Sequence, residues 1–280
     1  VVDVVGLQSA SMVKWPGMVF DPVDIFESIR LERRSVHRVL WELLLRAGMQ
    51  HQAKVVMDKS LDSVHYADEL VELFPDMLFL NVVRDPRAQV ASMNRAIIHD
   101  YDSGLNALAW LNAHKKAREL IQRIPEQVLT IRYEDFLTNQ ELILRKICQF
   151  FEIEFNTSML DVAHSDEAQQ IAHRSALWES NCFPPIMANK DKFKQQLSNE
   201  EINIIESVCA EYMKLYGYEF MSSANFQMNP DFLTVARQKS DVGRTQAWSN
   251  LRTQNYKDFV LRRFRAEYLS SIKQRLELSI

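Results

Sequence analysis

The chain has few glycines and cysteines, and its histidines are scattered. Six glycines among 280 residues leave no G-x-G-x-x-G loop, which disfavours a dinucleotide-dependent dehydrogenase. The seven histidines form no H-E-x-x-H pair, and no G-x-S-x-G elbow occurs, so zinc protease and serine hydrolase chemistries are also disfavoured. The three cysteines are odd in number and widely spaced, which argues against a disulfide framework or a zinc site: Cys148, Cys182 and Cys209.

Strong net charge and long apolar runs are absent as well. The formal net charge of -4 gives no general reason to expect a nucleic-acid partner. No apolar run approaches the roughly 20 residues that span a bilayer, and the start lacks the basic and apolar blocks of a signal peptide. With 47% hydrophobic and 25% charged residues, the chain is typical of one large domain, or one domain plus an appendage. We expect a cytoplasmic location, or a lumenal one if a targeting segment has been removed.

The most informative stretch runs from Phe79 to Ser92. Residues 77–83 have the length and apolar content of a strand buried on both faces, as in a parallel sheet. Asp85 suits a helix N-cap and Pro86 the first helical position, so Arg84 is predicted at the carboxyl end of the strand. Open α/β sheets bind ligands at that edge. The stretch therefore predicts an anion site, with an ordinary strand-end ion pair of Arg84 as the alternative.

Helix and strand signals alternate along the rest of the chain, which predicts an α/β fold with helices on both faces of the sheet. Further strands are expected at 53–57 and 127–132, and helices at 21–47, 64–74 and 103–124. Capping boxes beginning at Thr138 and Ser198 predict helices that run to about Phe151 and Tyr216. The pattern breaks down between residues 163 and 194, which predicts a mobile loop over the site.

The tail differs from the rest, so we divide the chain into a domain at 1–220 and a helical extension at 221–280. From residue 222 it holds ten basic and five acidic residues. Apolar residues from Trp248 to Ile272 follow an approximate helical stripe. We expect this stripe to pack on its own domain or on a second subunit. A basic surface for an acidic partner is the alternative.

Several motifs together carry a family resemblance over roughly residues 54–220. The chain resembles sulfotransferases that use 3′-phosphoadenosine 5′-phosphosulfate, whose motifs it carries in the family's order: Met-Asp-Lys-Ser at 57–60, Phe-Pro-Asp at 74–76, Arg84 with a Ser eight residues later, Ile-Arg-Tyr-Glu-Asp-Phe at 131–136, and Gly-Tyr-Glu at 217–219. The resemblance implies a three-layer α/β/α fold of the P-loop kinase type with a mostly parallel sheet. It also implies transfer of a sulfuryl group from this nucleotide to an acceptor hydroxyl or amine, without a metal.

The resemblance implies roles for single residues in nucleotide binding. Arg84 and Ser92 have the spacing of the pair that holds the 3′-phosphate in this family. Tyr133 resembles the family tyrosine that reaches the same phosphate, and Lys190 lies where the family often places a late basic contact. A half-buried strand tyrosine and a solvated run of lysines are the alternatives for the last two.

Two further residues are candidates for the chemistry. Lys59 resembles the lysine that follows the corresponding strand in the family, and a fixed ammonium there would stabilise charge on the transferring group. A surface lysine in a turn is the alternative. His65 is the nearest candidate for the general base that deprotonates the acceptor. A structural histidine, or a glutamate outside this sequence, is the alternative.

One departure from the family limits the resemblance. Such enzymes begin with a strand and a loop of the type Arg-Ser-Gly-Thr-Thr, whose amides bind the 5′-phosphosulfate. No such loop is evident, and residues 4–11 could be a strand and its degraded relic. Because the chain starts with Val, we expect instead that its N-terminal portion lies outside this sequence. The alternative function is a non-catalytic domain that binds a nucleotide or a partner. A nucleotide kinase of the same fold is a further alternative, but it would need a Walker lysine and a magnesium ligand, neither of which is evident in the sequence.

Overall fold

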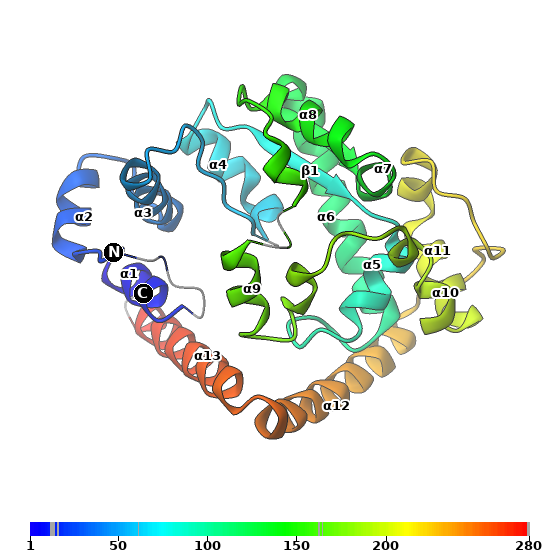
Figure 1. The fold of residues 1–280 in the computed structure, drawn as a ribbon. Helices are drawn as coiled ribbons and strands as arrows, with labels where there is room; N and C mark the ends of the chain where they lie inside the picture. The colour runs from blue at the N-terminus through cyan, green and yellow to red at the C-terminus, as the bar shows by residue number, and fades with distance from the viewer. Residues whose placement is uncertain (12–14, 16, 61, 162, 164, 279–280) are drawn as a thin grey trace.

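The computed structural model of the chain describes residues 1–11, 15, 17–60, 62–161, 163 and 165–278 (Figure 1). Its elements, in chain order, are α1 (Val2–Ser9), α2 (Pro22–Ile29), α3 (Val36–Gln50), the 3-10 helix η1 (Ser63–Tyr66), α4 (Ala67–Leu73), β1 (Phe79–Val83), α5 (Pro86–Met93), α6 (Ser103–Arg123), η2 (Pro125–Gln127), β2 (Val128–Arg132), α7 (Tyr133–Thr138), α8 (Gln140–Phe150), η3 (Thr157–Leu160), α9 (Asp166–Ala172), η5 (Glu179–Cys182), η6 (Met187–Lys190), α10 (Phe193–Gln196), α11 (Asn199–Leu215), α12 (Pro230–Gln254) and α13 (Tyr256–Glu277).

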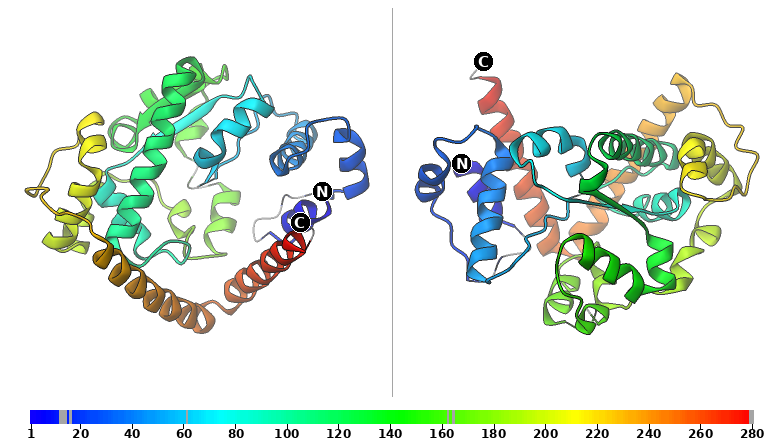
Figure 2. Two further views of the ribbon diagram at one scale, coloured as in Figure 1. Left: turned by 180° about the vertical axis from the view of Figure 1, so that it is seen from behind. Right: turned by 90° about the horizontal axis from the view of Figure 1, so that it is seen from above.

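The sheet of the described residues has two parallel strands. β1 pairs with β2 in a register that sets Phe79 opposite Val128 and Val83 opposite Arg132. The crossover between them passes through α5 and α6, and α6 lies along one face of the sheet (Figures 1 and 2). The predicted α/β class with a parallel sheet is confirmed, although helices dominate the chain.

The main core lies between the sheet and three helices. Val83 at the end of β1 packs with apolar side chains of α5, α6 and α11 in one buried cluster. Trp110, Ile205 and Met213 are among the largest side chains that are fully buried in it. This packing holds the carboxyl end of β1 and the start of α5 in a rigid setting.

The predicted strand at 53–57 is wrong, since that segment is neither helix nor strand. Its apolar residues fit the pattern of a buried strand, but Val55 and Met57 are 37% and 55% exposed. A strand requires backbone pairing, and the described strands pair only with each other. Within the described residues, the edge of β1 that faces away from β2 is therefore unpaired.

The N-terminal predictions are also corrected. Residues 4–11 do not form a strand with a degraded loop, because α1 is a helix through most of that range. The single helix expected at 21–47 is divided into α2 and α3. Asp21 caps the first as predicted, accepting a hydrogen bond from the Val23 amide at 2.8 Å. Ser35 then caps a new helix by accepting from the His37 amide at 3.0 Å, because a serine hydroxyl competes for the backbone and restarts the helix.

One predicted capping box is present and one is not. Ser198 and Glu201 form the reciprocal box that begins α11. At the other, Asn139 is the cap of α8, whereas the Thr138 hydroxyl donates to the Glu134 carbonyl of the preceding helix. The region at 163–194 holds the short helices α9, η5 and η6 and the start of α10, although residue 164 lies outside the described part. The prediction that this region is mobile stays a prediction.

The C-terminal extension is helical, as predicted, but it is divided at Asn255 into α12 and α13. α12 contacts α6, and α13 extends back toward the N-terminal helices (Figures 1 and 2). The Tyr268 hydroxyl donates to Asp3 at 2.9 Å, so the two ends of the described chain meet. Among the described helices, none combines the length and apolar character that crossing a membrane requires.

Candidate functional site

Arg84 and Tyr133 lie side by side at the carboxyl end of the sheet. Val83 and Arg132 are paired across the two strands, so the residues that follow them emerge together. The Arg84 guanidinium lies over the Tyr133 ring at 4.9 Å from its centroid. Nη2 of Arg84 donates weakly to the Asn189 carbonyl at 3.4 Å, while its buried Nε has no hydrogen-bond partner in the described part of the chain. In the described structure the half-buried Arg84 thus makes one weak hydrogen bond, which leaves guanidinium donors for an anion.

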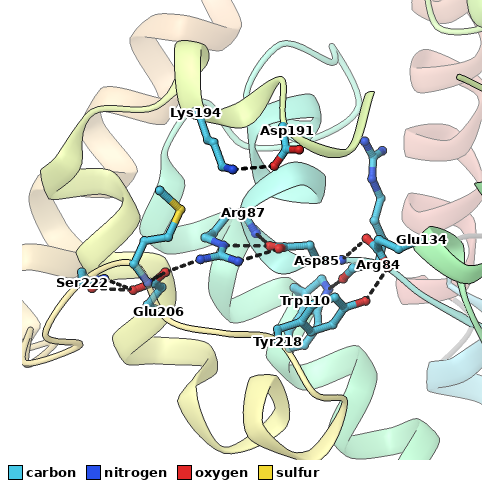
Figure 3. Close-up of polar contacts among 11 residues, drawn as sticks. Arg84, Asp85, Arg87, Trp110, Glu134, Asp191, Lys194, Glu206, Tyr218 and Ser222 are labelled. Atoms are coloured by element: carbon cyan, nitrogen blue, oxygen red, sulfur yellow. Dashed lines mark hydrogen bonds and ion pairs between the residues drawn. The ribbon is translucent and has the colours of Figure 1, made fainter. Parts of the chain in front are cut away.

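The peptide bond between Arg84 and Asp85 is held from both sides (Figure 3). Its carbonyl accepts a hydrogen bond from the Trp110 indole at 3.2 Å, and its amide donates to Oε1 of Glu134 at 2.9 Å. The Tyr218 hydroxyl donates to the other oxygen of Glu134 at 2.8 Å. Burial, together with the Glu134 carboxylate, raises the pKa of Tyr218, which keeps the phenol protonated as a donor. These contacts fix the backbone from which the Arg84 side chain projects.

A buried ion network anchors the start of α5 to α11. Asp85 caps α5 by accepting from the Arg87 amide at 2.9 Å, and its carboxylate also binds the Arg87 guanidinium at 2.7 Å. Arg87 donates in turn to Glu206 at 2.5 Å (Figure 3). Burial would raise the pKa of Glu206, but hydrogen bonds from Ser222, the Met221 amide and Arg87 lower it overall. The carboxylate therefore stays charged and tethers α5.

Ser92 and Lys190 lie on the elements that follow or contact Arg84. Ser92 is exposed on α5, two turns after the strand. Lys190 is exposed at the end of η6, next to Asn189, whose carbonyl accepts from Arg84. η6 contacts α7, the helix that begins with Tyr133. Of the four nucleotide residues predicted from the sequence, Arg84 and Tyr133 are thus in contact, and Lys190 follows a residue bonded to Arg84.

Lys59 lines a cavity of about 630 Å³ beside the unpaired edge of β1. Asn81 of β1, Gln89 of α5 and His114 of α6 contribute polar groups to the same wall. His65 is exposed in η1 and does not line this cavity, so the structure does not bring it together with Lys59. Within the described ranges no cluster of three or more His, Cys, Asp or Glu side chains could hold a metal ion.

Comparison with known proteins supplies the family. A model described as the sulfotransferase family matches residues 6–157, which is more than half of the chain. The chain belongs to the sulfotransferase family. A search of curated proteins finds no match. The match to this sulfotransferase model includes Lys59, Arg84, Ser92 and Tyr133 and ends before Lys190. It also extends further toward the N-terminus than the resemblance seen in the motifs.

Membership of the sulfotransferase family carries a P-loop-like α/β fold and sulfotransfer activity in general. Glu134 and Tyr218, which hold Arg84 in place, stand inside the motifs at 131–136 and 217–219, although the sequence predicted no role for either. Those two motifs could therefore have indicated that Glu134 and Tyr218 belong to the site. Trp110 had no such signal, because its partner Arg84 is 26 residues away. Arg87 lies inside the stretch at 79–92, but its partner Glu206 is 119 residues away, so that contact could not be predicted.

Proposed function

We propose that this sulfotransferase uses 3′-phosphoadenosine 5′-phosphosulfate as its sulfuryl donor. The observation that carries the proposal is the Arg84 guanidinium, which lies over the Tyr133 ring at the carboxyl end of the sheet and makes one weak hydrogen bond in the described structure. A phosphate there would receive charge-assisted hydrogen bonds from Arg84. Ser92 and Tyr133 would add hydroxyl contacts, and Lys190 a late basic contact to the nucleotide.

In the proposed reaction an acceptor oxygen or nitrogen forms a bond to sulfur. The bond between sulfur and the bridging oxygen breaks, and its electron pair leaves with the 5′-phosphate. The acceptor proton passes to a general base, for which His65 remains the prediction from the sequence. Lys59 would stabilise the negative charge that develops on the bridging oxygen, since a fixed ammonium does so without a metal.

We predict that the protein binds 3′-phosphoadenosine 5′-phosphate more tightly than adenosine 5′-monophosphate, by calorimetric titration. Hydrogen bonds to a charged group contribute about 1.5–3 kcal/mol, so the preference should be roughly 10- to 100-fold. Arg84→Ala should abolish it, and Ser92→Ala should reduce it. Arg95→Ala is the matched control, because Arg95 is a nearby exposed arginine bonded to Gln196. Equal affinity of the unaltered protein for the two nucleotides would overturn the donor assignment.

The alternative function, a domain that binds the nucleotide without turnover, has one observation in its favour. Residues 4–9, which could have been a relic of the phosphate-binding loop, lie inside α1 and form a helix. The same titration combined with an assay of sulfuryl transfer separates the two functions. Preference for the bisphosphate with transfer supports the enzyme, and preference without transfer to any acceptor supports the binding domain.

A further inference from the structure

Another cavity lies between the three N-terminal helices. It has a volume of about 780 Å³, and its walls come from α1, α2, the start of α3 and the residues between α2 and α3. These helices lie together at the side of the molecule away from α10 and α11 (Figures 1 and 2). The cavity shares no lining residue with the one that Lys59 lines. A volume of this size lies in the range of small-molecule sites.

Most of the wall is apolar, and much of this apolar surface is open to water. Val23 and Phe26 of α2 are 65% and 49% exposed, and Val36 of α3 is 68% exposed. Deeper in, the wall joins a buried apolar cluster, because Val39 belongs to that cluster and Ile29 packs against it. An apolar chain in the cavity would remove this surface from water, which is favourable.

The charged side chains of this wall are all of one sign. Arg30, Arg33 and Arg34 line the cavity, and among the described residues no aspartate or glutamate does. Arg30 pairs with Glu27 at 3.3 Å, and Arg33 pairs with Glu72. All four of these side chains are more than half exposed, so their ion pairs contribute little and can be exchanged. Arg34 has no hydrogen bond or ion pair within the described structure.

We propose that this cavity binds a long-chain fatty acid, with the alkyl chain along the apolar wall and the carboxylate among the three arginines. A guanidinium can bind a carboxylate through two parallel hydrogen bonds, and Arg34 has no competing carboxylate in the described structure. A neutral lipid would leave the arginines without an anion, and a small hydrophilic anion would leave the apolar wall in water. A planar membrane surface would cover the recess without filling it.

The test is calorimetric titration of the full chain with decanoate and decan-1-ol, below the concentrations at which they aggregate. The two probes have the same chain length and differ in the charge of the head group. Decanoate should bind at least about 10-fold more tightly, because hydrogen bonds to a charged group exceed those to a neutral one. Octanoate should bind roughly 10-fold less tightly than decanoate, since two fewer CH₂ groups are buried.

Replacing the arginines tests the position of the carboxylate. Arg34→Ala should reduce the preference for decanoate over decan-1-ol, and Arg30→Ala, Arg33→Ala and Arg34→Ala together should remove it. Arg237→Ala is the matched control, since Arg237 is an exposed arginine of α12 outside the cavity. The three arginines of the cavity are exposed, so these variants should fold, and thermal unfolding checks this.

A change in the apolar wall tests the position of the alkyl chain. Val23→Ser should weaken binding of decanoate and decan-1-ol by the same factor, because it removes apolar contact without changing charge. Val242→Ser is the matched control, since Val242 is 71% exposed on α12 and lies outside the cavity. Its affinities for both probes should equal those of the unaltered protein.

Three outcomes would overturn the proposal. They are equal binding of decanoate and decan-1-ol, a preference for decanoate that survives replacement of all three arginines, and binding of phosphatidylglycerol vesicles without binding of decanoate. The last would assign the arginines to a membrane surface instead. No nucleotide takes part in these measurements, so the fatty-acid site stands or falls separately from the proposed function.

Discussion

At the scale of single residues, Glu134 uses both of its carboxylate oxygens in a buried position. One accepts from the Asp85 amide and the other from the Tyr218 hydroxyl. Trp110 holds the carbonyl of the same peptide bond. The backbone at Arg84 is thus held directly by Glu134 and Trp110, and Tyr218 holds Glu134, which reduces the entropy that Arg84 would lose on binding an anion.

We predict that Glu134→Ala lowers affinity for 3′-phosphoadenosine 5′-phosphate more than affinity for adenosine 5′-monophosphate. The Asp85 amide would lose its partner, and the variant should also lose about 1–3 kcal/mol of unfolding free energy. Glu134→Gln is the conservative control, because its amide oxygen can still accept from Asp85. Calorimetry at a temperature where every variant is folded provides the readout. An equal loss for both nucleotides would indicate a structural role alone.

At the scale of elements, α12 approaches α6 and the segment before it closely. A Cβ at Gly243 would lie 2.4 Å from Cβ of Tyr101, and one at Gly104 would lie 2.6 Å from Cε1 of Phe232. The Ser240 hydroxyl donates to Asp100 at 2.8 Å and accepts from the Tyr101 amide at 3.1 Å. The two glycines therefore permit a helix contact that any larger residue would push apart.

Gly243→Ala should destabilise the attachment of α12. Alanine is about 1 kcal/mol better than glycine inside a helix, but overpacking typically costs about 1–3 kcal/mol. We expect a net loss in the free energy of unfolding and faster amide exchange in α12. Gln246→Ala, an exposed change in the same helix, should leave both unchanged. A more stable Gly243→Ala protein would show that α12 moves away from Tyr101 without cost.

At the scale of the whole molecule, the C-terminal helix joins the N-terminal one. Tyr268 and Arg275 of α13 both bind Asp3 of α1, at 2.9 and 2.7 Å. Hydrogen bonds from Arg275 and Tyr268 lower the pKa of Asp3. At the other end of α13, near its start, Asp258 is buried and accepts a hydrogen bond from the Ser175 hydroxyl at 2.6 Å. The extension thus links regions that are far apart in the sequence, and its role in joining a second subunit stays a prediction.

Tyr268→Phe should loosen the joint between α1 and α13 without unfolding the core. Because the Asp3 side chain is 38% exposed, solvent screens the contact and the loss in unfolding free energy should stay below about 1 kcal/mol. Amide exchange should become faster in α1 and in the second half of α13 and stay unchanged in α6. Tyr256→Phe is the matched control, since Tyr256 is 64% exposed on the same helix. Unaltered exchange in α1 would show that this hydrogen bond does not hold the two ends together.

The sequence by itself determined the features that depend on neighbouring residues. The junction of β1 and α5, with Arg84, the Asp85 cap and Pro86, was predictable because a cap bonds to an amide two residues away. The capping box at Ser198 and the helix cap at Asp21 were predictable for the same reason. The family resemblance added Tyr133, which was predicted to reach the same phosphate as Arg84, and the two side chains are in contact.

Only the tertiary structure decided the features that depend on distant partners. Residues 53–57 have the composition of a strand, but pairing decides whether a strand forms, and the described strands pair elsewhere. Glu134 reaches Asp85 across 49 residues, and Trp110 reaches Arg84 across 26. The β1–β2 register, which brings Tyr133 to Arg84, joins residues of similar separation. No local pattern encodes such contacts, because they form only when the whole core packs and their partners become neighbours in space.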